Sequence, residues 1–166
     1  TFYVTTNFID KNFMSWVDRL ERVLEDTSKN KILVPWGSFK ANSVSDKIGL
    51  LNNLRKVLKS NPNHDPDDIA NDIITQLGKK IKFTGTSEID KKMNWKNIKV
   101  LSSENIFTIA PHSHNHKILS FCDANTLNLE ISDSINFLKK KAKIKNIHFA
   151  YPDGQENHYK NKVIII

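Results

Sequence analysis

The stretch MNWKNIKVLSSENIFTIAPHSHNHKILSF, residues 93–121, decides the fold class. It predicts a helix that Asn94 caps, followed by a short apolar strand at Ile106–Ala110 that Pro111 ends, because proline cannot donate a hydrogen bond to a sheet. The helix buries the apolar side chains that recur at helical spacing, which are Trp95, Ile98 and Leu101. A helix followed by a buried strand is a repeating unit of parallel sheets.

The segments on both sides extend this alternation of helices and strands. β-branched and aromatic residues predict strands at 1–6 and 147–151, and a short extended piece at 31–36. Apolar stripes at helical spacing predict helices at 13–25, 46–59, 65–77 and 126–142. The order predicts an α/β fold with a parallel sheet, in which a functional site lies at the carboxyl ends of the strands.

Capping residues fix some of these helix ends. Asn12 is expected to cap the helix that starts at Phe13. Asp65 is expected to cap the third helix, with Pro66 at its first position and Gly78 as its stop.

Composition and charge narrow the classes of protein. The chain has 166 residues, 39% of them hydrophobic and 26% charged, which suits a globular domain. The single cysteine, Cys122, excludes an internal disulfide, and no apolar run is long enough to cross a bilayer. The formal net charge is +7, but only three residues are arginines. The one dense lysine run, Lys139–Lys145, suits the solvated end of a helix, so we do not expect nucleic-acid binding.

Three of the six histidines, His112, His114 and His116, fall within five residues directly after the strand that ends near Ala110. Imidazole is the commonest metal ligand. On a helical turn, the four-residue spacing of His112 and His116 places both rings on one face, where they can hold one metal ion with a further ligand. The alternative is a polar loop, and His114 is expected to point elsewhere. The other histidines are expected in a loop (His64), in the last strand (His148) and at the surface (His158).

A second group of residues, Tyr151-Pro152-Asp153-Gly154, follows the last predicted strand. Such a turn can direct backbone N–H groups into a cleft, where they stabilise an oxyanion. Pro-Asp-Gly is also an ordinary turn sequence, so this alternative stays open.

These motifs, in this order, resemble those of the polysaccharide deacetylase family, the NodB homology domain of carbohydrate esterase family 4. The stretch at residues 93–121, with His112-Ser113-x-x-His116 and then Leu119 and Ser120, resembles the second block of the family, and IHFAYPDGQ, residues 147–155, resembles the third. TFYVTTNFID, residues 1–10, followed by MSWVDRL, residues 14–20, resembles the segment just after the first block. Together they cover most of the chain outside residues 38–85.

The resemblance implies hydrolysis of N-acetyl and, less often, O-acetyl groups on an acetylated sugar polymer or glycan. It implies a divalent metal ion, for which zinc is expected and cobalt, nickel and manganese are alternatives. His112 and His116 match the two metal-binding histidines, and Ser113 matches the residue that supports them. The third-block matches are Tyr151 and Asp153, whose backbone would meet the oxyanion, and Pro152 and Gly154, which would line the substrate groove.

The family fold is a distorted (β/α) barrel, and the resemblance places two of its parts outside this sequence. An Asp-Asp pair, which supplies the general base and the third metal ligand, belongs before Thr1, and a general-acid histidine belongs after Ile166. We therefore expect residues 1–166 to be a single incomplete catalytic domain, a partial barrel without its first and last strands, inactive alone. A helical insertion is expected at about residues 38–82. The resemblance is compatible with secretion or the cell envelope, and the sequence itself does not set the compartment.

Two other functions stay open. The first is a non-catalytic, carbohydrate-binding relative of the family. An Asp-Asp pair upstream of this sequence would distinguish an enzyme from such a relative. The second is a basic interaction module that uses Lys139–Lys145 and binds polyanions in a salt-sensitive way. The segment 38–82 is expected to be a scaffold, with a wall of the substrate groove as the alternative. Trp36 is expected to be a hydrophobic anchor beside Pro35, with stacking on a sugar as the alternative.

Overall fold

A computed structural model describes residues 1–11, 13–80, 91–144 and 148–158. The chain divides into two compact units, one of Thr1–Phe13 with Thr84–Ile166 and the other of Met14–Phe83. We call them the histidine unit and the helical unit. Parts of our expectations lie outside the described residues, namely Asn12, Lys145 and Ile147.

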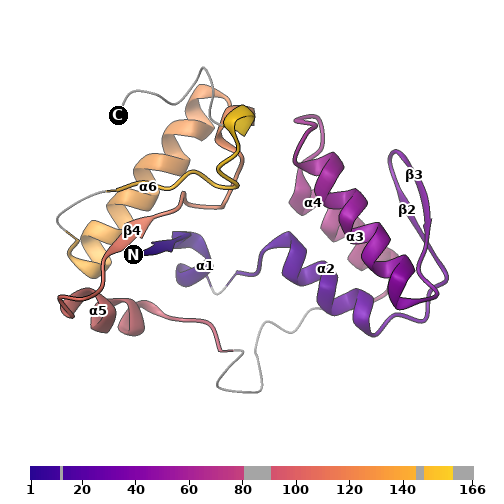
Figure 1. Cartoon of the computed structure of the whole chain (residues 1–166), viewed down its shortest axis with the longest axis horizontal. Coiled ribbons are helices and arrows are strands. Elements are labelled where there is room, and N and C mark those ends of the chain that lie inside the picture. Colours follow the sequence, from indigo (N-terminus) through magenta and orange to yellow (C-terminus); the bar gives the residue numbers. More distant parts are fainter. Residues whose placement is uncertain (12, 81–90, 145–147, 159–166) are drawn as a thin grey trace. The chain divides into compact units, whose positions relative to one another are not determined.

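The histidine unit is built on a parallel strand pair. Strand β1 (Phe2–Val4) pairs with β4 (Ile109–Pro111), in a register that sets Tyr3 opposite Ala110. Figure 1 shows the two strands side by side beneath helix α6. The helices of this unit are α1 (Thr6–Asp10), α5 (Trp95–Ser103) and α6 (Ala124–Ala142), with 3-10 turns η1 (Leu119–Phe121) and η2 (Glu156–His158). Mixed helices and parallel strands confirm the α/β class.

Two small apolar clusters hold the histidine unit together. In one, Val4 and Ile109 from the strands pack against α5 and α6 through the buried residues Ile98, Leu138 and Ala142. In the other, Leu119 and Ile131 pack with the half-buried rings of Phe149 and Tyr151. The strand pair and the segment that carries Tyr151 are therefore both fixed by contacts with α6 or its flanking turn.

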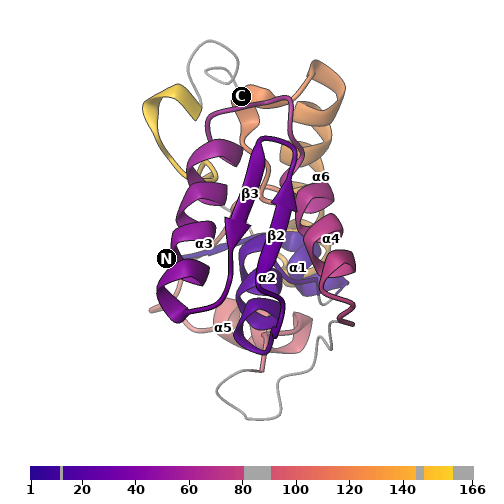
Figure 2. The same cartoon turned by 90° about the vertical axis from the view of Figure 1, so that its right-hand side faces the viewer.

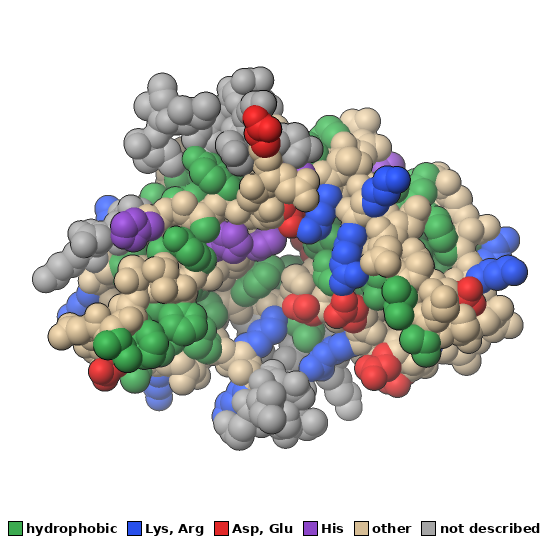
Figure 3. Space-filling model, viewed as in Figure 1, with side chains coloured by type: hydrophobic (Ala, Val, Ile, Leu, Met, Phe, Trp, Pro, Cys, Tyr) green, Lys and Arg blue, Asp and Glu red, His purple; other side chains and the backbone are tan. Residues whose placement is uncertain are grey.

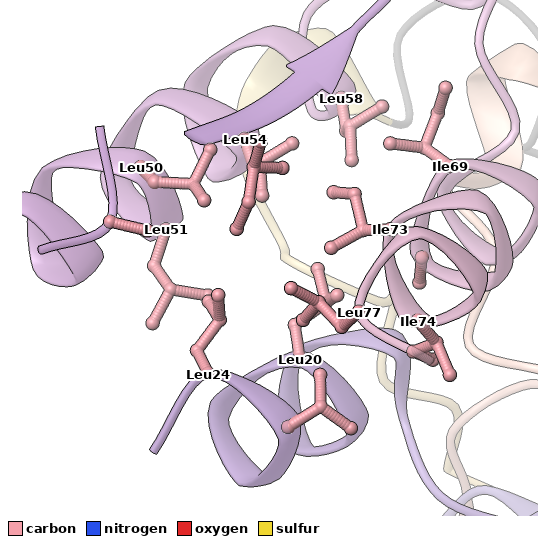
Figure 4. Close-up of a cluster of buried hydrophobic side chains, with 14 residues drawn as sticks. Leu20, Leu24, Leu50, Leu51, Leu54, Leu58, Ile69, Ile73, Ile74 and Leu77 are labelled. Atoms are coloured by element: carbon pink, nitrogen blue, oxygen red, sulfur yellow. The ribbon is translucent and has the colours of Figure 1, made fainter. Parts of the chain in front are cut away.

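The helical unit contains α2 (Trp16–Glu25), the hairpin of β2 (Lys31–Val34) and β3 (Gly37–Lys40), α3 (Val44–Leu58) and α4 (Pro66–Gln76). Figure 2 shows the hairpin against α3 and α4. Leucine and isoleucine side chains of the three helices point toward one another in Figure 4 and form the core of this unit. The Gln76 side chain donates to the Leu33 carbonyl (2.9 Å) and accepts from the Leu33 N–H (3.0 Å), so it satisfies the outer edge of β2.

Several helix ends follow the capping residues of the sequence. Asp65 accepts hydrogen bonds from the N–H groups of Asp67 and Asp68, Pro66 is the first residue of α4, and Gly78 has a φ of 62°. Asn94 caps α5 as expected. These ends are predictable because a capping side chain bonds only to its own helix turn.

Several boundaries were predicted wrongly. The strand expected at residues 1–6 is the shorter β1, which ends at Val4, because α1 begins at Thr6. Helix α2 starts at Trp16, not Phe13, because Ser15 caps it through the Asp18 N–H (3.1 Å) while the Phe13 ring packs against Phe8. The strand expected at 106–110 is β4 at Ile109–Pro111, because the chain turns after α5 and leaves Ile106 83% exposed.

The last strand was expected at 147–151, but the described residues 148–151 are not a strand. The Ala150 N–H donates to the Pro111 carbonyl (3.2 Å), and the turn that follows leads the chain away. The extended piece at 31–36 is the first strand of a hairpin that the sequence did not predict, since its Pro35-Trp36 turn lacks an Asn-Gly or Asp-Gly signature.

Candidate functional site

The loop that carries the histidines lies at the shared carboxyl end of β1 and β4. It runs alongside the residues that follow β1 and is tied to them by backbone hydrogen bonds. The His112 N–H donates to the Val4 carbonyl (3.0 Å), and the Asn7 N–H donates to the His114 carbonyl (2.9 Å). The Thr5 hydroxyl donates to the His112 carbonyl (3.1 Å). The hydrogen bonds between the two chain segments therefore continue beyond the last residues of β1 and β4, and they position the histidine loop.

The structure brings His112 and His116 together. Their ring centroids lie 4.8 Å apart, with the ring planes at 77° to each other. They do not pair on a helical turn, because residues 112–116 are not helical and the chain bends at His114 and Asn115. Instead, Ser113 and His116 both have a φ of 62°, in the left-handed region. Each such non-glycine residue costs about 1–3 kcal/mol, so the loop keeps this shape only if its surroundings hold it.

Ser113 supplies part of that support. It is fully buried, and its hydroxyl oxygen accepts a hydrogen bond from the His116 N–H (2.9 Å). The bond spans the turn between the two histidines, so Ser113 fixes where the backbone of His116 lies.

The segment before the Tyr151–Gly154 turn meets the first histidine. Nδ1 of His112 lies 2.9 Å from the Ala150 carbonyl oxygen. Because a carbonyl oxygen only accepts, Nδ1 must carry the hydrogen, and this tautomer leaves a lone pair on Nε2. Metal-binding histidines are commonly oriented by this kind of contact on the other ring nitrogen. The two sequence motifs, far apart in the chain, therefore meet through His112 and Ala150.

The turn itself has two residues in the left-handed region, Asp153 with a φ of 61° and Gly154 with a φ of 58°. Tyr151 is half-buried and packs edge-on against Phe149, with centroids 5.5 Å apart. Pro152 is buried, whereas Gly154 is exposed. The packing of Tyr151 and the burial of Pro152 hold the turn in place after Ala150, which contacts His112.

Aromatic rings flank the histidine pair. The Phe8 ring from α1 stacks on His116 (centroids 6.4 Å apart, planes 20°), and Tyr3, which is 48% exposed, tilts against His112 at 6.4 Å. Figure 3 shows histidine side chains reaching the surface next to hydrophobic ones. The pair is therefore bordered by apolar surface that a sugar ring can contact.

The remaining histidines lie elsewhere. Nδ1 of His114 is 2.8 Å from the Thr6 hydroxyl, and its ring lies against Phe137. His64 contacts Trp36 in the helical unit. Two expectations were wrong: His148 is exposed and not in a strand, and His158 is 1% exposed because it packs against Phe121.

The sequence analysis missed Glu130. This side chain on α6 is 2% exposed, and its two carboxylate oxygens accept from the N–H (2.7 Å) and the side-chain Nδ2 (2.6 Å) of Asn115. Asn115 in turn accepts from Nδ2 of Asn7 (2.6 Å). A signal was present in the sequence, because Glu130 falls on the same helix face as Leu127 and Ser134, which marks it as a charged residue on the inward side.

Within the described ranges, no three His, Cys, Asp or Glu side chains are grouped closely enough to hold a metal ion. The candidate metal site in this part of the chain consists of His112 and His116. In the same ranges, no helix combines the length and the apolar character needed to cross a membrane.

Comparison with known proteins identifies the family. Searches of curated proteins and of solved structures returned no match. The family model described as polysaccharide deacetylase matches residues 70–164, which include the histidine loop and the Tyr151–Gly154 turn. This match covers more than half of the 166 residues. The chain therefore belongs to the polysaccharide deacetylase family.

Proposed function

We propose that this chain is the central part of a metal-dependent carbohydrate deacetylase, which hydrolyses the C–N bond of acetamido groups on a sugar polymer or glycan. The observation that carries the proposal is the His112–His116 pair, with ring centroids 4.8 Å apart and Nδ1 of His112 on the Ala150 carbonyl. Family membership supports a carbohydrate substrate.

The donor set fits a borderline-soft divalent cation, of which zinc is the best match and cobalt, nickel or manganese are the alternatives. Nε2 of His112 is available as a ligand in the tautomer that the Ala150 contact requires. His116 is the second proposed ligand. Such an ion polarises an acetyl carbonyl and lowers the pKa of a bound water.

The other residues of the motifs have supporting roles in this proposal. Ser113 holds the His116 backbone through the 2.9 Å bond. The backbone N–H groups around Tyr151 and Asp153 would donate to the oxyanion that forms during acetyl hydrolysis. Pro152 and Gly154 would line the substrate groove. The contact between Ala150 and His112 supports these assignments, because it keeps the turn segment next to the proposed metal ligands.

The proposal takes the remaining chemistry from outside the described residues. A third ligand and a general base would come from an Asp-Asp pair, and a general acid from a further histidine, with the whole protein forming a distorted (β/α) barrel. Residues 1–166 would then be one incomplete catalytic domain, with a helical insertion at about residues 38–82. The chain alone would be inactive.

A non-catalytic carbohydrate-binding relative is the second candidate. It is favoured by one observation, that the described residues group no third metal ligand with the histidine pair. The lysine run gives less support to a basic module, since Lys139, Lys140 and Lys141 lie in the last turn of α6, where cations suit the helix dipole.

Zinc binding and acetate release test the proposal. The proteins are this chain, a version extended upstream of Thr1, and a His112→Ala/His116→Ala variant of each. We expect the extended protein to bind one zinc ion and to release acetate from an N-acetylated sugar oligomer, and we expect the double variant to lose both activities. His64→Ala is the matched control, because it removes a histidine of the helical unit. Equal zinc binding by the double variant and its parent would overturn the metal site, and zinc binding without acetate release would favour the non-catalytic relative.

A further inference from the structure

Glu130 is a buried carboxylate that contacts the histidine loop and has no role in the function proposed above. Both of its oxygens accept hydrogen bonds from one residue, Asn115, which precedes His116. Burying a carboxylate is costly unless it is hydrogen-bonded, and here two short bonds of 2.6 and 2.7 Å compensate it. The Glu130 carboxylate therefore binds both the backbone and the side chain of Asn115 in the loop.

The loop needs these hydrogen bonds because part of its backbone lies in the left-handed region. Ser113 and His116, on either side of Asn115, are both left-handed with a φ of 62°. Without support, non-glycine residues leave this region for a more favourable one. Asn115 is held from α6 by Glu130 and from α1 by Asn7, so two helices clamp the residue next to the second histidine.

We propose that Glu130 is a positioning residue that fixes His116 relative to His112 and so sets the affinity of the pair for a divalent cation. This inference rests on the proposed function, because it assumes that the two histidines bind the metal. Glu130 touches neither imidazole in the contacts described above, and it acts through Asn115. Supporting groups of this kind typically change metal affinity by about 10–100-fold.

Two single variants disrupt the hydrogen bonds between Glu130 and Asn115 in different ways. Glu130→Met keeps the length of the side chain and its fit to a helix, but it leaves both Asn115 donors without their acceptors. Asn115→Asp replaces the side-chain donor with a second carboxylate that faces Glu130. We expect each to weaken zinc binding by the protein extended upstream of Thr1 by about tenfold or more, as measured by calorimetry.

A combined variant provides the rescue. In Asn115→Asp/Glu130→Gln, the side-chain N–H of residue 130 donates to the carboxylate of residue 115. The amide oxygen of residue 130 still accepts the backbone N–H of residue 115, and the carboxylate of residue 115 still accepts from Nδ2 of Asn7. We expect this variant to bind zinc with an affinity within about threefold of the parent, because the hydrogen bonds between residues 115 and 130 are restored. Ile131→Val is the control, because it removes a buried methyl group from the neighbouring position on α6 without touching Asn115.

Metal-free amide exchange separates this inference from the proposed function. We expect the N–H groups of Asn115 and His116 to exchange about tenfold faster in Glu130→Met than in the parent, and to be unchanged in Ile131→Val, because only the first variant removes the acceptor of the Asn115 N–H. Unchanged exchange and unchanged zinc affinity in folded Glu130→Met would overturn the inference. If the extended parent binds no zinc, the proposed function fails and the metal role of Glu130 fails with it. Faster exchange would then show only that Glu130 holds the loop.

Discussion

Replacing Ser113 tests whether the histidine loop is held in a strained shape. Ser113 is fully buried, has a φ of 62°, and accepts the His116 N–H at 2.9 Å. Ser113→Ala removes the acceptor and keeps the backbone strain. Ser113→Gly removes the same acceptor and also relieves the strain, because glycine enters the left-handed region freely. The two variants therefore differ in strain but not in hydrogen bonding.

The change in the free energy of unfolding can be worked out for each variant. Losing the acceptor of a buried N–H costs about 1–3 kcal/mol, which we expect as the destabilisation of Ser113→Ala. Glycine regains about 1–2 kcal/mol of left-handed strain, and loses about 0.4–1 kcal/mol through the greater freedom of the unfolded chain. Ser113→Gly should therefore be as stable as Ser113→Ala or up to about 1.5 kcal/mol more stable. Both should bind zinc about tenfold more weakly than the parent, because neither holds the His116 backbone.

The assay must report on the histidine unit alone. Trp95 lies in that unit, whereas Trp16 and Trp36 lie in the helical unit. Urea unfolding followed by Trp95 fluorescence, in a background with the other two tryptophans replaced by phenylalanine, measures the free energy of unfolding where Ser113 acts. A Ser113→Gly variant clearly less stable than Ser113→Ala would refute the strain argument. Parent-like stability and zinc affinity in Ser113→Ala would refute the role of the hydroxyl.

Three further predictions concern the rest of the chain. Lys143 ends α6 with a φ of 55°, so Lys143→Gly should stabilise the histidine unit by about 1 kcal/mol in urea unfolding, and a loss of stability would contradict this. Leu54 is fully buried in the helical unit, so Leu54→Ala should cost about 2–5 kcal/mol, while Ile48→Ala, at a residue 53% exposed, should change little. Both are measured by urea unfolding of the helical unit, followed by Trp16 and Trp36 fluorescence with Trp95 replaced by phenylalanine. The backbone N–H of Ser43 donates to Asp46 and lowers the pKa of its carboxyl below 3.8. The ionised form is thus favoured by folding, and this contribution is present above pH 3.8 and lost as the pH falls through the lowered value. An NMR titration that finds an ordinary pKa for Asp46 would contradict it.

The helices could be predicted from the sequence because their determinants are local. Asp65 and Asn94 cap helices through N–H groups two or three residues away, and Leu54 falls on an apolar stripe that any helix of this sequence would bury. The start of α2 was missed for the opposite reason. Phe13 fits the stripe of that helix, but it belongs to the histidine unit and its ring packs on Phe8 of the same unit, and a local pattern cannot show this choice.

The histidine pair was expected from its spacing, but its geometry has another origin. No glycine marks residues 112–116, so the left-handed Ser113 and His116 give no sequence signal, and a helical turn was the natural expectation. Glu130 gave a weak signal as a charged residue on the inward face of α6. Its partner could not be predicted, because Asn115 is 15 residues away and is reached through the loop.

The spacing of two histidines is not sufficient to make a metal site, since each ring needs an orientation that the motif does not supply. His112 receives its orientation from the Ala150 carbonyl, 38 residues later in the chain. The backbone of His116 receives its position from Ser113 within the loop, and the loop is clamped at Asn115 by α6 and α1. A transplanted His-Ser-x-x-His sequence without these contacts would relax to ordinary backbone angles and separate the rings. The chain of contacts from Glu130 to Asn115 to His116 is therefore as much a part of the candidate site as the two imidazoles.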